Sequence, residues 1–157
     1  MKNGWDRLGS FLNGAAAAAQ LYARAAQNGS FIEAVCLSAN LIDAQLRLGL
    51  ILKRQIQRRD RTVDIDLLLQ ADGDKPLFEK EIYEMAHVEG VISRDLHDRL
   101  KSLYTDRNRV VHRYIITDLK TEDVLEIGVR YEQIEREVER SRVAAGGPEV
   151  GGAGELS

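Results

Sequence analysis

Residues 30–58 read SFIEAVCLSANLIDAQLRLGLILKRQIQR and carry the longest helical pattern of the chain. Ser30 is followed three residues later by Glu33, the spacing of a capping box at a helix N-terminus. The apolar residues that follow cover more than one face of this helix, which is typical of a helix enclosed by others. The pattern therefore predicts a long helix, ending near Arg58, that lies at the centre of a bundle or is buried against a second copy of the protein.

Helical patterns also occupy residues 10–27, 76–90, 93–114 and 121–142, and a short apolar insert occupies residues 65–69. The first pattern contains five consecutive alanines, the residue with the highest helix propensity. The chain has only two prolines among 157 residues, and no segment shows a convincing strand pattern. We therefore predict an all-α fold, an antiparallel bundle of five or six helices.

The length and composition fit one domain of ordinary size. Apolar residues make up 44% of the chain and charged residues 30%, an ordinary balance for a soluble protein. We expect residues 1–144 to form this single helical domain. The Gly-rich residues 145–157 show no apolar periodicity and are expected to be a disordered tail.

Charge and targeting features restrict the surroundings of the protein. The formal net charge is −3, so the chain lacks the basic excess of a general nucleic-acid binder. Basic residues cluster within residues 53–61 and 99–113, where they could hold a phosphate backbone or form solvated helix faces.

Cys36 lies among apolar residues and is expected to be a small buried hydrophobic residue. We see neither a signal peptide nor an uncharged apolar run of membrane-spanning length, so we expect a cytoplasmic protein without membrane contact.

An apolar seam in residues 93–114 is interrupted by an arginine. Its members recur at spacings of four and three residues: Leu96, Leu100, Leu103, Arg107, Val110 and Tyr114. A buried, unpaired guanidinium in the place of a leucine would cost several kcal/mol. Either Arg107 reaches a polar cleft, or the helix breaks near Thr105 and restarts with Asp106 as its N-cap. Tyr114, at the end of the seam, is most simply a core residue.

Arg107, Asn108 and His112 are the candidate functional residues of this segment. Asn108 and His112 share a helix face, whereas Arg107 and His112 lie roughly 140° apart around the axis. A histidine can take the proton of an RNA 2′-hydroxyl, and an arginine can hold two oxygens of the phosphate that is attacked. One copy lacks a second acid or base, which a two-fold dimer would supply. The alternative is that both residues are structural: His112 lies near a helix end, and Arg107 extends along the surface to water.

Arg107-Asn108, followed by His112-Arg113-Tyr114, resembles the signature of HEPN domains and most closely that of HepT-like toxins. That signature is an arginine, four residues, a histidine, one residue and a tyrosine. The resemblance implies a helical dimer that is a metal-independent endoribonuclease, of the toxin or phage-defence kind, with its site where two motifs meet. It implies that Arg107 and His112 are catalytic and that Asn108 supports them. It also implies that a partner nucleotidyltransferase antitoxin modifies Tyr114 with AMP.

The resemblance leaves the second polar residue and the activity open. HEPN domains often have a further polar residue on an earlier helix, and Glu33, Asn40 and Asp43 are the candidates here. Many HEPN domains are catalytically silent, so one alternative is a module that binds a nucleotide or a protein partner. A second alternative is a plain dimerisation scaffold.

No metal or cofactor is expected. Glu84 and His87 have the Glu-x-x-His spacing of di-iron bundles, but the chain has no second pair of this kind. His97, next to Asp98, is expected to be exposed.

Overall fold

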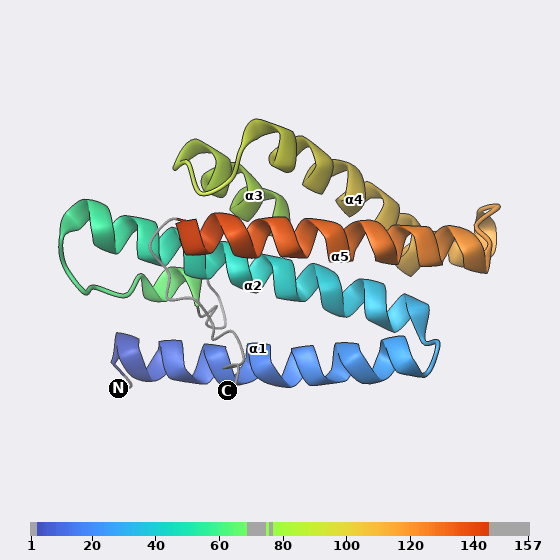
Figure 1. Cartoon of the computed structure of the whole chain (residues 1–157), viewed down its shortest axis with the longest axis horizontal. Helices are drawn as coiled ribbons and strands as arrows, with labels where there is room; N and C mark the ends of the chain where they lie inside the picture. Colours follow the sequence, from blue (N-terminus) through green and yellow to red (C-terminus); the bar gives the residue numbers. More distant parts are fainter. Residues whose placement is uncertain (1–2, 69–74, 76, 145–157) are drawn as a thin grey trace, which may run out of the picture.

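The computed structural model describes residues 3–68, residue 75 and residues 77–144. Within these residues it contains five α-helices, two short 3-10 helices and no strand. The elements are α1 (Gly4–Gln27), α2 (Phe31–Arg58), η1 (Ile65–Leu67), α3 (Glu79–Val88), α4 (Arg94–Arg113), η2 (Tyr114–Ile116) and α5 (Thr121–Ala144). They form a helical bundle (Figure 1), which confirms the predicted all-α class. The predicted tail, residues 145–157, lies outside the described residues.

The long helix α2 is the centre of the bundle. It contacts all four other α-helices, with α1 on one side and α5, α3 and α4 on the other (Figure 1). Val35, Ile42, Leu46 and Leu50 of α2 are completely buried within the single chain. By length and composition alone α2 would also suffice to cross a membrane, but 56% of its most apolar window is buried inside the bundle. Of the two predicted positions for this helix, the central one is therefore observed.

The helix ends follow local capping, with two departures from prediction. α1 begins at Gly4 rather than near residue 10, because Asn3 and Asp6 form a capping box in which each side chain accepts a hydrogen bond from the other's backbone N–H. α2 begins directly after Ser30 as predicted, but the Ser30 side chain makes no capping hydrogen bond. α4 begins as predicted, with Ser93 Oγ accepting from the Leu96 N–H. Pro76, predicted in the first turn of the third helix, lies outside the described residues, and α3 begins at Glu79.

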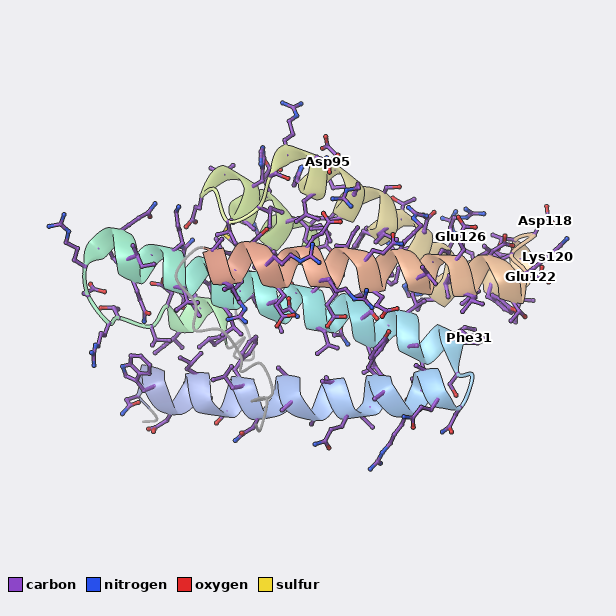
Figure 2. The ribbon with its side chains drawn as sticks, in the orientation of Figure 1. Phe31, Asp95, Asp118, Lys120, Glu122 and Glu126 are labelled. Carbon is purple, nitrogen blue, oxygen red and sulfur yellow. The ribbon has the colours of Figure 1, made fainter. Side chains whose placement is uncertain are left out.

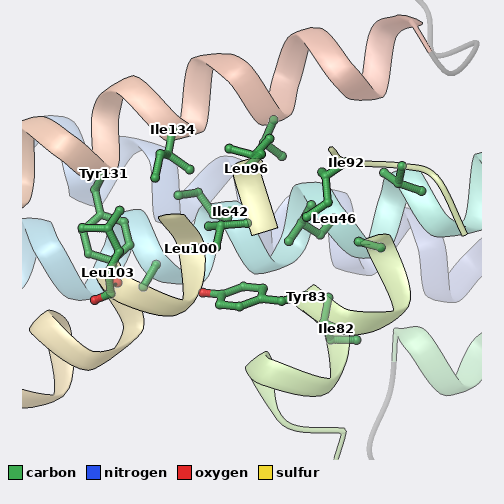
Figure 3. Close-up of a cluster of buried hydrophobic side chains, with 14 of the residues drawn as sticks. Ile42, Leu46, Ile82, Tyr83, Ile92, Leu96, Leu100, Leu103, Tyr131 and Ile134 are labelled. Carbon is green, nitrogen blue, oxygen red and sulfur yellow. Dashed lines mark hydrogen bonds between the residues drawn. The ribbon is translucent and has the colours of Figure 1, made fainter. Parts of the chain in front are cut away.

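α4 runs unbroken through the predicted break point. Leu96, Leu100, Leu103 and Val110 are buried along one face, so the seam inferred from their spacing is the core face of α4 (Figure 3). Asp106 is not a new N-cap, because its carboxylate forms an ion pair with Arg130 of α5 at 2.8 Å. The predicted alternative of a broken helix is therefore wrong.

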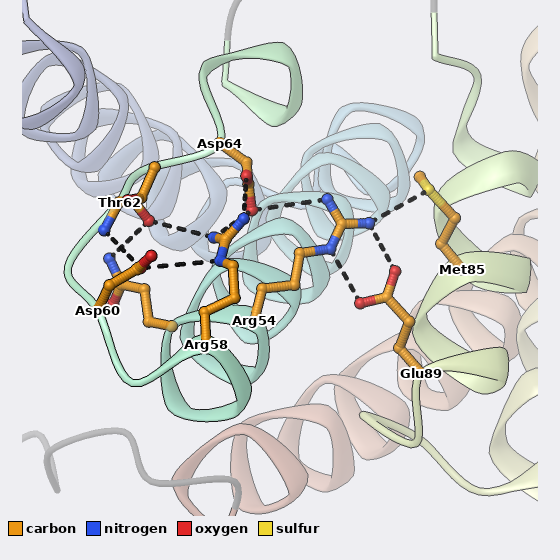
Figure 4. Close-up of polar contacts among 8 residues, drawn as sticks. Arg54, Arg58, Asp60, Thr62, Asp64, Met85 and Glu89 are labelled. Atoms are coloured by element: carbon orange, nitrogen blue, oxygen red, sulfur yellow. Dashed lines mark hydrogen bonds and ion pairs between the residues drawn. The ribbon is translucent and has the colours of Figure 1, made fainter.

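The basic residues at the end of α2 hold the connection to α3. Arg54 donates from Nε and Nη2 to both carboxylate oxygens of Glu89, at 2.9 and 2.5 Å (Figure 4). Arg58 donates from Nη1 to Asp64 at 3.0 Å. Two cations of the 53–61 cluster are thus engaged in ion pairs that link α2 to the following segment and to the end of α3.

The prediction that His97 is exposed is wrong. Only 6% of His97 is exposed, and its ring stacks on that of His87 with the centroids 5.0 Å apart. Its two ring nitrogens lie 2.9 Å from a Glu84 carboxylate oxygen and 3.2 Å from one of Asp98. His97 is buried because it lies on the side of α4 that packs against α3. The expectation of exposure rested on its charged neighbour Asp98, which carries no information about this packing. Among the described residues, no three histidine, cysteine or acidic side chains are grouped to hold a metal.

Gly49 marks the closest approach of α2 to the segment after α3. A Cβ at this position would lie 2.7 Å from Cγ1 of Val91, which is itself buried. We expect Gly49→Ala to lower the free energy of unfolding by about 1–2 kcal/mol, because the overpacking exceeds the gain in helix propensity. Urea unfolding of Gly14→Ala gives the control, since no atom lies within 4 Å of a Cβ there and a gain of up to about 1 kcal/mol is expected. Equal stabilisation by both substitutions would contradict the close contact.

Candidate functional site

The last turns of α4 bring His112 and Asn108 to one pocket. The pocket has a volume of about 340 Å³ and is lined by Lys80, Tyr104, Thr105, Asn108, Arg109, His112 and Arg113. All but Lys80 come from α4, and Lys80 comes from the first turn of α3. Asn108 and His112 therefore share a face, as their i, i+4 spacing predicts.

Basic side chains from two helices line the pocket. Lys80, Arg109 and Arg113 contribute three cations, and none of the described residues that line the pocket is acidic. Arg109 is half exposed and lies 3.8 Å from Asp106, a distance that leaves its guanidinium donors available to a ligand. Phosphate groups bind to such convergent donors, and a histidine beside them can exchange a proton with the bound group. The arrangement of His112, Asn108 and three cations suits a phosphodiester.

Arg107 lies behind one wall of this pocket. Its Nη2 is 2.5 Å from Oε2 of Glu79 on α3, and the two side chains are only 19% and 16% exposed. Its Cζ lies 4.8 Å from the centroid of the Tyr104 ring, and that ring lines the pocket. Arg107 was predicted to reach a polar cleft; it is not among the residues that line the pocket, and its closest partner is the Glu79 carboxylate inside the bundle.

Glu79 is held from two sides. Tyr83, one turn further along α3, donates its hydroxyl to Oε1 of Glu79, while Oε2 accepts from Arg107. Burial raises the pKa of Glu79 and the charge of Asp43 raises it further, whereas Tyr83 and Arg107 act in the opposite direction. Burial, followed by the Glu79 carboxylate, raises the pKa of the Tyr83 hydroxyl above its ordinary value. The hydroxyl is therefore a proton donor to Glu79 throughout the physiological pH range.

Sequence reasoning did not identify Glu79. An arginine in an apolar seam signals that a partner of opposite charge exists, but 28 residues separate Glu79 from Arg107. The one local signal is the i, i+4 spacing of Glu79 and Tyr83, which places a carboxylate and a hydroxyl on one face of α3.

Tyr114 faces a different pocket from His112. It is half-buried in η2, packs against the hydrophobic core, and lines a cavity of about 520 Å³ together with residues of the α1–α2 turn and of α5. The cavity is lined by Gly29, Ser30, Phe31, Ile32, Glu33, Tyr114, Thr121 and Val124. The four candidate residues thus divide among three surroundings: Asn108 and His112 in the basic pocket, Arg107 beside Glu79, and Tyr114 in this second cavity.

The three candidates for a further polar residue occupy different places. Glu33 lines the cavity of Tyr114, and Asn40 is exposed on α2. Asp43 is largely buried, pairs with Arg47 at 2.6 Å, and raises the pKa of Glu79 through its charge. Asp43 is therefore the candidate whose charge acts on Glu79, the partner of Arg107.

Cys36 is half-buried rather than fully buried, and burial raises the pKa of its thiol. A raised pKa disfavours the thiolate at neutral pH, so this cysteine is a poor nucleophile.

Comparison with known proteins identifies no relative of the chain. No protein-family model matches it, and neither a curated protein nor a solved structure does.

Proposed function

We propose that this protein is a metal-independent endoribonuclease of the HEPN type, similar to HepT-like toxins, that works as a two-fold dimer. The observation that carries the proposal is the basic pocket in which His112 and Asn108 meet Lys80, Arg109 and Arg113. The proposal includes a cytoplasmic location, RNA as the substrate, and a role as a toxin or phage-defence effector.

The chemistry uses the 2′-hydroxyl of RNA as the nucleophile. His112 removes its proton or, in the opposite protonation state, protonates the leaving 5′-oxygen. Lys80, Arg109 and Arg113 hold the neighbouring phosphates, and Asn108 orients the imidazole or the scissile phosphate. Arg107, which lies beside the pocket next to Tyr104, stabilises the negative charge that builds up on the non-bridging oxygens of the phosphorane. The products carry a 2′,3′-cyclic phosphate and a free 5′-hydroxyl.

A second copy of the chain is needed because one pocket offers one histidine, whereas the reaction uses both a base and an acid. The surface beside His112 favours such a pairing, because Ile115 and Ile116 are 95% and 80% exposed on η2. Isolated exposed isoleucines are ordinary, but two adjacent ones next to a charged pocket are typical of an interface. Figure 2 shows Asp118 before α5 and Glu122 and Glu126 in its first turns, with Lys120 as the one labelled cation among them; these carboxylates could meet the basic end of α4 of a second copy. A two-fold axis would place each acidic group opposite a basic one.

The regulation implied by the resemblance concerns Tyr114. A nucleotidyltransferase antitoxin would attach AMP to its hydroxyl, which adds bulk and negative charge two residues from His112. The cavity of about 520 Å³ beside Tyr114 supplies space next to this side chain.

A catalytically silent module that binds a nucleotide or a protein partner is the second candidate. The pairing of Arg107 with Glu79 favours it, because this ion pair accounts for an arginine in the seam without any catalytic role. The basic pocket would then bind an anion without cleaving it.

The test is RNA cleavage in excess chelator. We expect the parent protein to cleave under these conditions, to leave 2′,3′-cyclic phosphate ends, and to lose activity by about a hundredfold to a thousandfold in Arg107→Ala. Arg24→Ala removes an exposed cation from α1, on the far side of α2 from the pocket, and should leave the rate unchanged. Cleavage that depends on a divalent metal, or that survives Arg107→Ala in full, would contradict the proposal. RNA binding without cleavage would support the silent module.

A further inference from the structure

The Arg54–Glu89 and Arg107–Glu79 ion pairs differ in the number of hydrogen bonds that the arginine donates. Arg54 donates two parallel hydrogen bonds to Glu89, from Nε and Nη2 to the two carboxylate oxygens (Figure 4). Arg107 gives Glu79 only Nη2, since the second oxygen of Glu79 is occupied by the Tyr83 hydroxyl. The fork-to-fork geometry that arginine and carboxylate favour is therefore absent at Arg107.

The single contact leaves other donors of Arg107 without partners. Its Nε is buried and has no hydrogen-bond partner among the described residues. Buried N–H groups are nearly always paired in folded proteins, so an unpaired one needs an explanation, such as a catalytic role or a bound ligand. A purely structural ion pair would gain from a second hydrogen bond, whereas a guanidinium that must bind a ligand needs donors that are not yet engaged. Because Nε is buried, a ligand can reach this guanidinium only through its Nη1 and Nη2 hydrogens.

The position of the guanidinium is nevertheless constrained. It lies over the Tyr104 ring, and Lys80 Nζ lies 4.6 Å from the centroid of the same ring. Tyr104 and Lys80 both line the pocket of His112. Tyr104 therefore adjoins both the guanidinium and the pocket, and Glu79 restricts the rotation of an otherwise flexible side chain. A group held in place before its ligand arrives loses less conformational entropy on binding.

Resting on the proposed ribonuclease function, we propose that Glu79 is a positioning residue for Arg107. Together with Tyr83, it holds the guanidinium by one N–H next to the pocket and keeps the remaining donors for a substrate phosphate. Glu79 does not contact the RNA and transfers no proton. Its contribution is the orientation of Arg107.

The test compares the same substitution at both pairs. We expect Glu79→Gln to lower kcat about tenfold to a hundredfold with little change in KM, because small misplacements of a catalytic group have effects of this size. Glu89→Gln is the matched control, since it weakens the Arg54 pair at the other end of α3 and should leave kcat unchanged. Tyr83→Phe removes only the hydroxyl that holds the second oxygen of Glu79, and should also lower kcat.

A double-mutant cycle separates positioning from a structural role. In an Arg107→Ala background, Glu79→Gln should cause no further loss of kcat, because no guanidinium remains to be held. An equal loss in both backgrounds would mean that Glu79 acts independently of Arg107 and would overturn the inference. A kcat that is unchanged or higher in Glu79→Gln alone would overturn it as well.

A measurement without catalysis distinguishes failure of this inference from failure of the proposed function. The Nε–H signal of Arg107 is followed by NMR during titration with a 2′-deoxy oligonucleotide, which lacks the nucleophile. If the parent cleaves no RNA, the proposed function fails, yet a shift of this signal in the parent and its loss in Glu79→Gln would still support the positioning role. An equal shift in both proteins, or none in either, would overturn it.

Discussion

Replacement of His112 by alanine is expected to lower the rate of RNA cleavage by at least about a hundredfold, the usual contribution of a positioned general acid or base. His112 is exposed in the last turn of α4 and makes no part of the hydrophobic core. The variant should therefore unfold at the same denaturant concentration as the parent. A loss of activity at unchanged stability would assign the effect to the chemistry of the imidazole.

Single-turnover cleavage measures this effect, with enzyme in excess over labelled RNA and chelator present. Arg94→Ala is the control on the same helix, because Arg94 is 85% exposed at the opposite end of α4 from the pocket. It should cleave at the parental rate. Parental activity in His112→Ala would instead point to another site or to a contaminating nuclease, and would end the case for the pocket as a catalytic centre.

Replacement of Leu46 by alanine is expected to reduce the free energy of unfolding by about 2–5 kcal/mol. Leu46 is completely buried on the central helix, among side chains from α3 and α4 (Figure 3). Removing its branched end leaves a cavity that the surrounding helices can close only in part. Single domains are stable by about 5–15 kcal/mol, so this one substitution removes a large share of the total.

Urea unfolding of the purified variant tests this expectation. Leu21→Ala is the matched control, because Leu21 of α1 is 47% exposed and alanine has the higher helix propensity. Its unfolding midpoint should shift little. Similar losses in both variants would mean that the core is not centred on α2, which would contradict the packing described above.

The candidate site was predictable from the sequence only in part. The i, i+4 spacing of Asn108 and His112 placed both on one face, and the structure places both in one pocket. The contribution of Lys80 was not foreseen, because it comes from a helix that precedes α4 by a loop. Tyr114 was read as part of the same motif, yet it lines a separate cavity because the chain leaves the α-helix after Arg113 and turns into η2.

The fold itself followed from local patterns. Apolar spacing and end signals identified all five α-helices, because the hydrogen bonds and caps of a helix involve residues close in sequence. The early start of α1 was missed, although its capping residues Asn3 and Asp6 are also local. The burial of His97 could not be read in this way, since it depends on how α3 packs against α4.

Local sequence established the helices and the presence of an arginine within an apolar seam, and it left two possible positions for the long helix α2. The partner of that arginine emerged only when α3 packed against α4 and brought Glu79 to Arg107. The physical reason is range: helical periodicity depends on neighbours within four residues, whereas an ion pair forms wherever the folded chain brings opposite charges together in a partly buried place. Tyr83 reaches the second oxygen of Glu79 through their local i, i+4 spacing on α3, whereas the packing of α3 on α4 left Nε of Arg107 without a partner among the described residues.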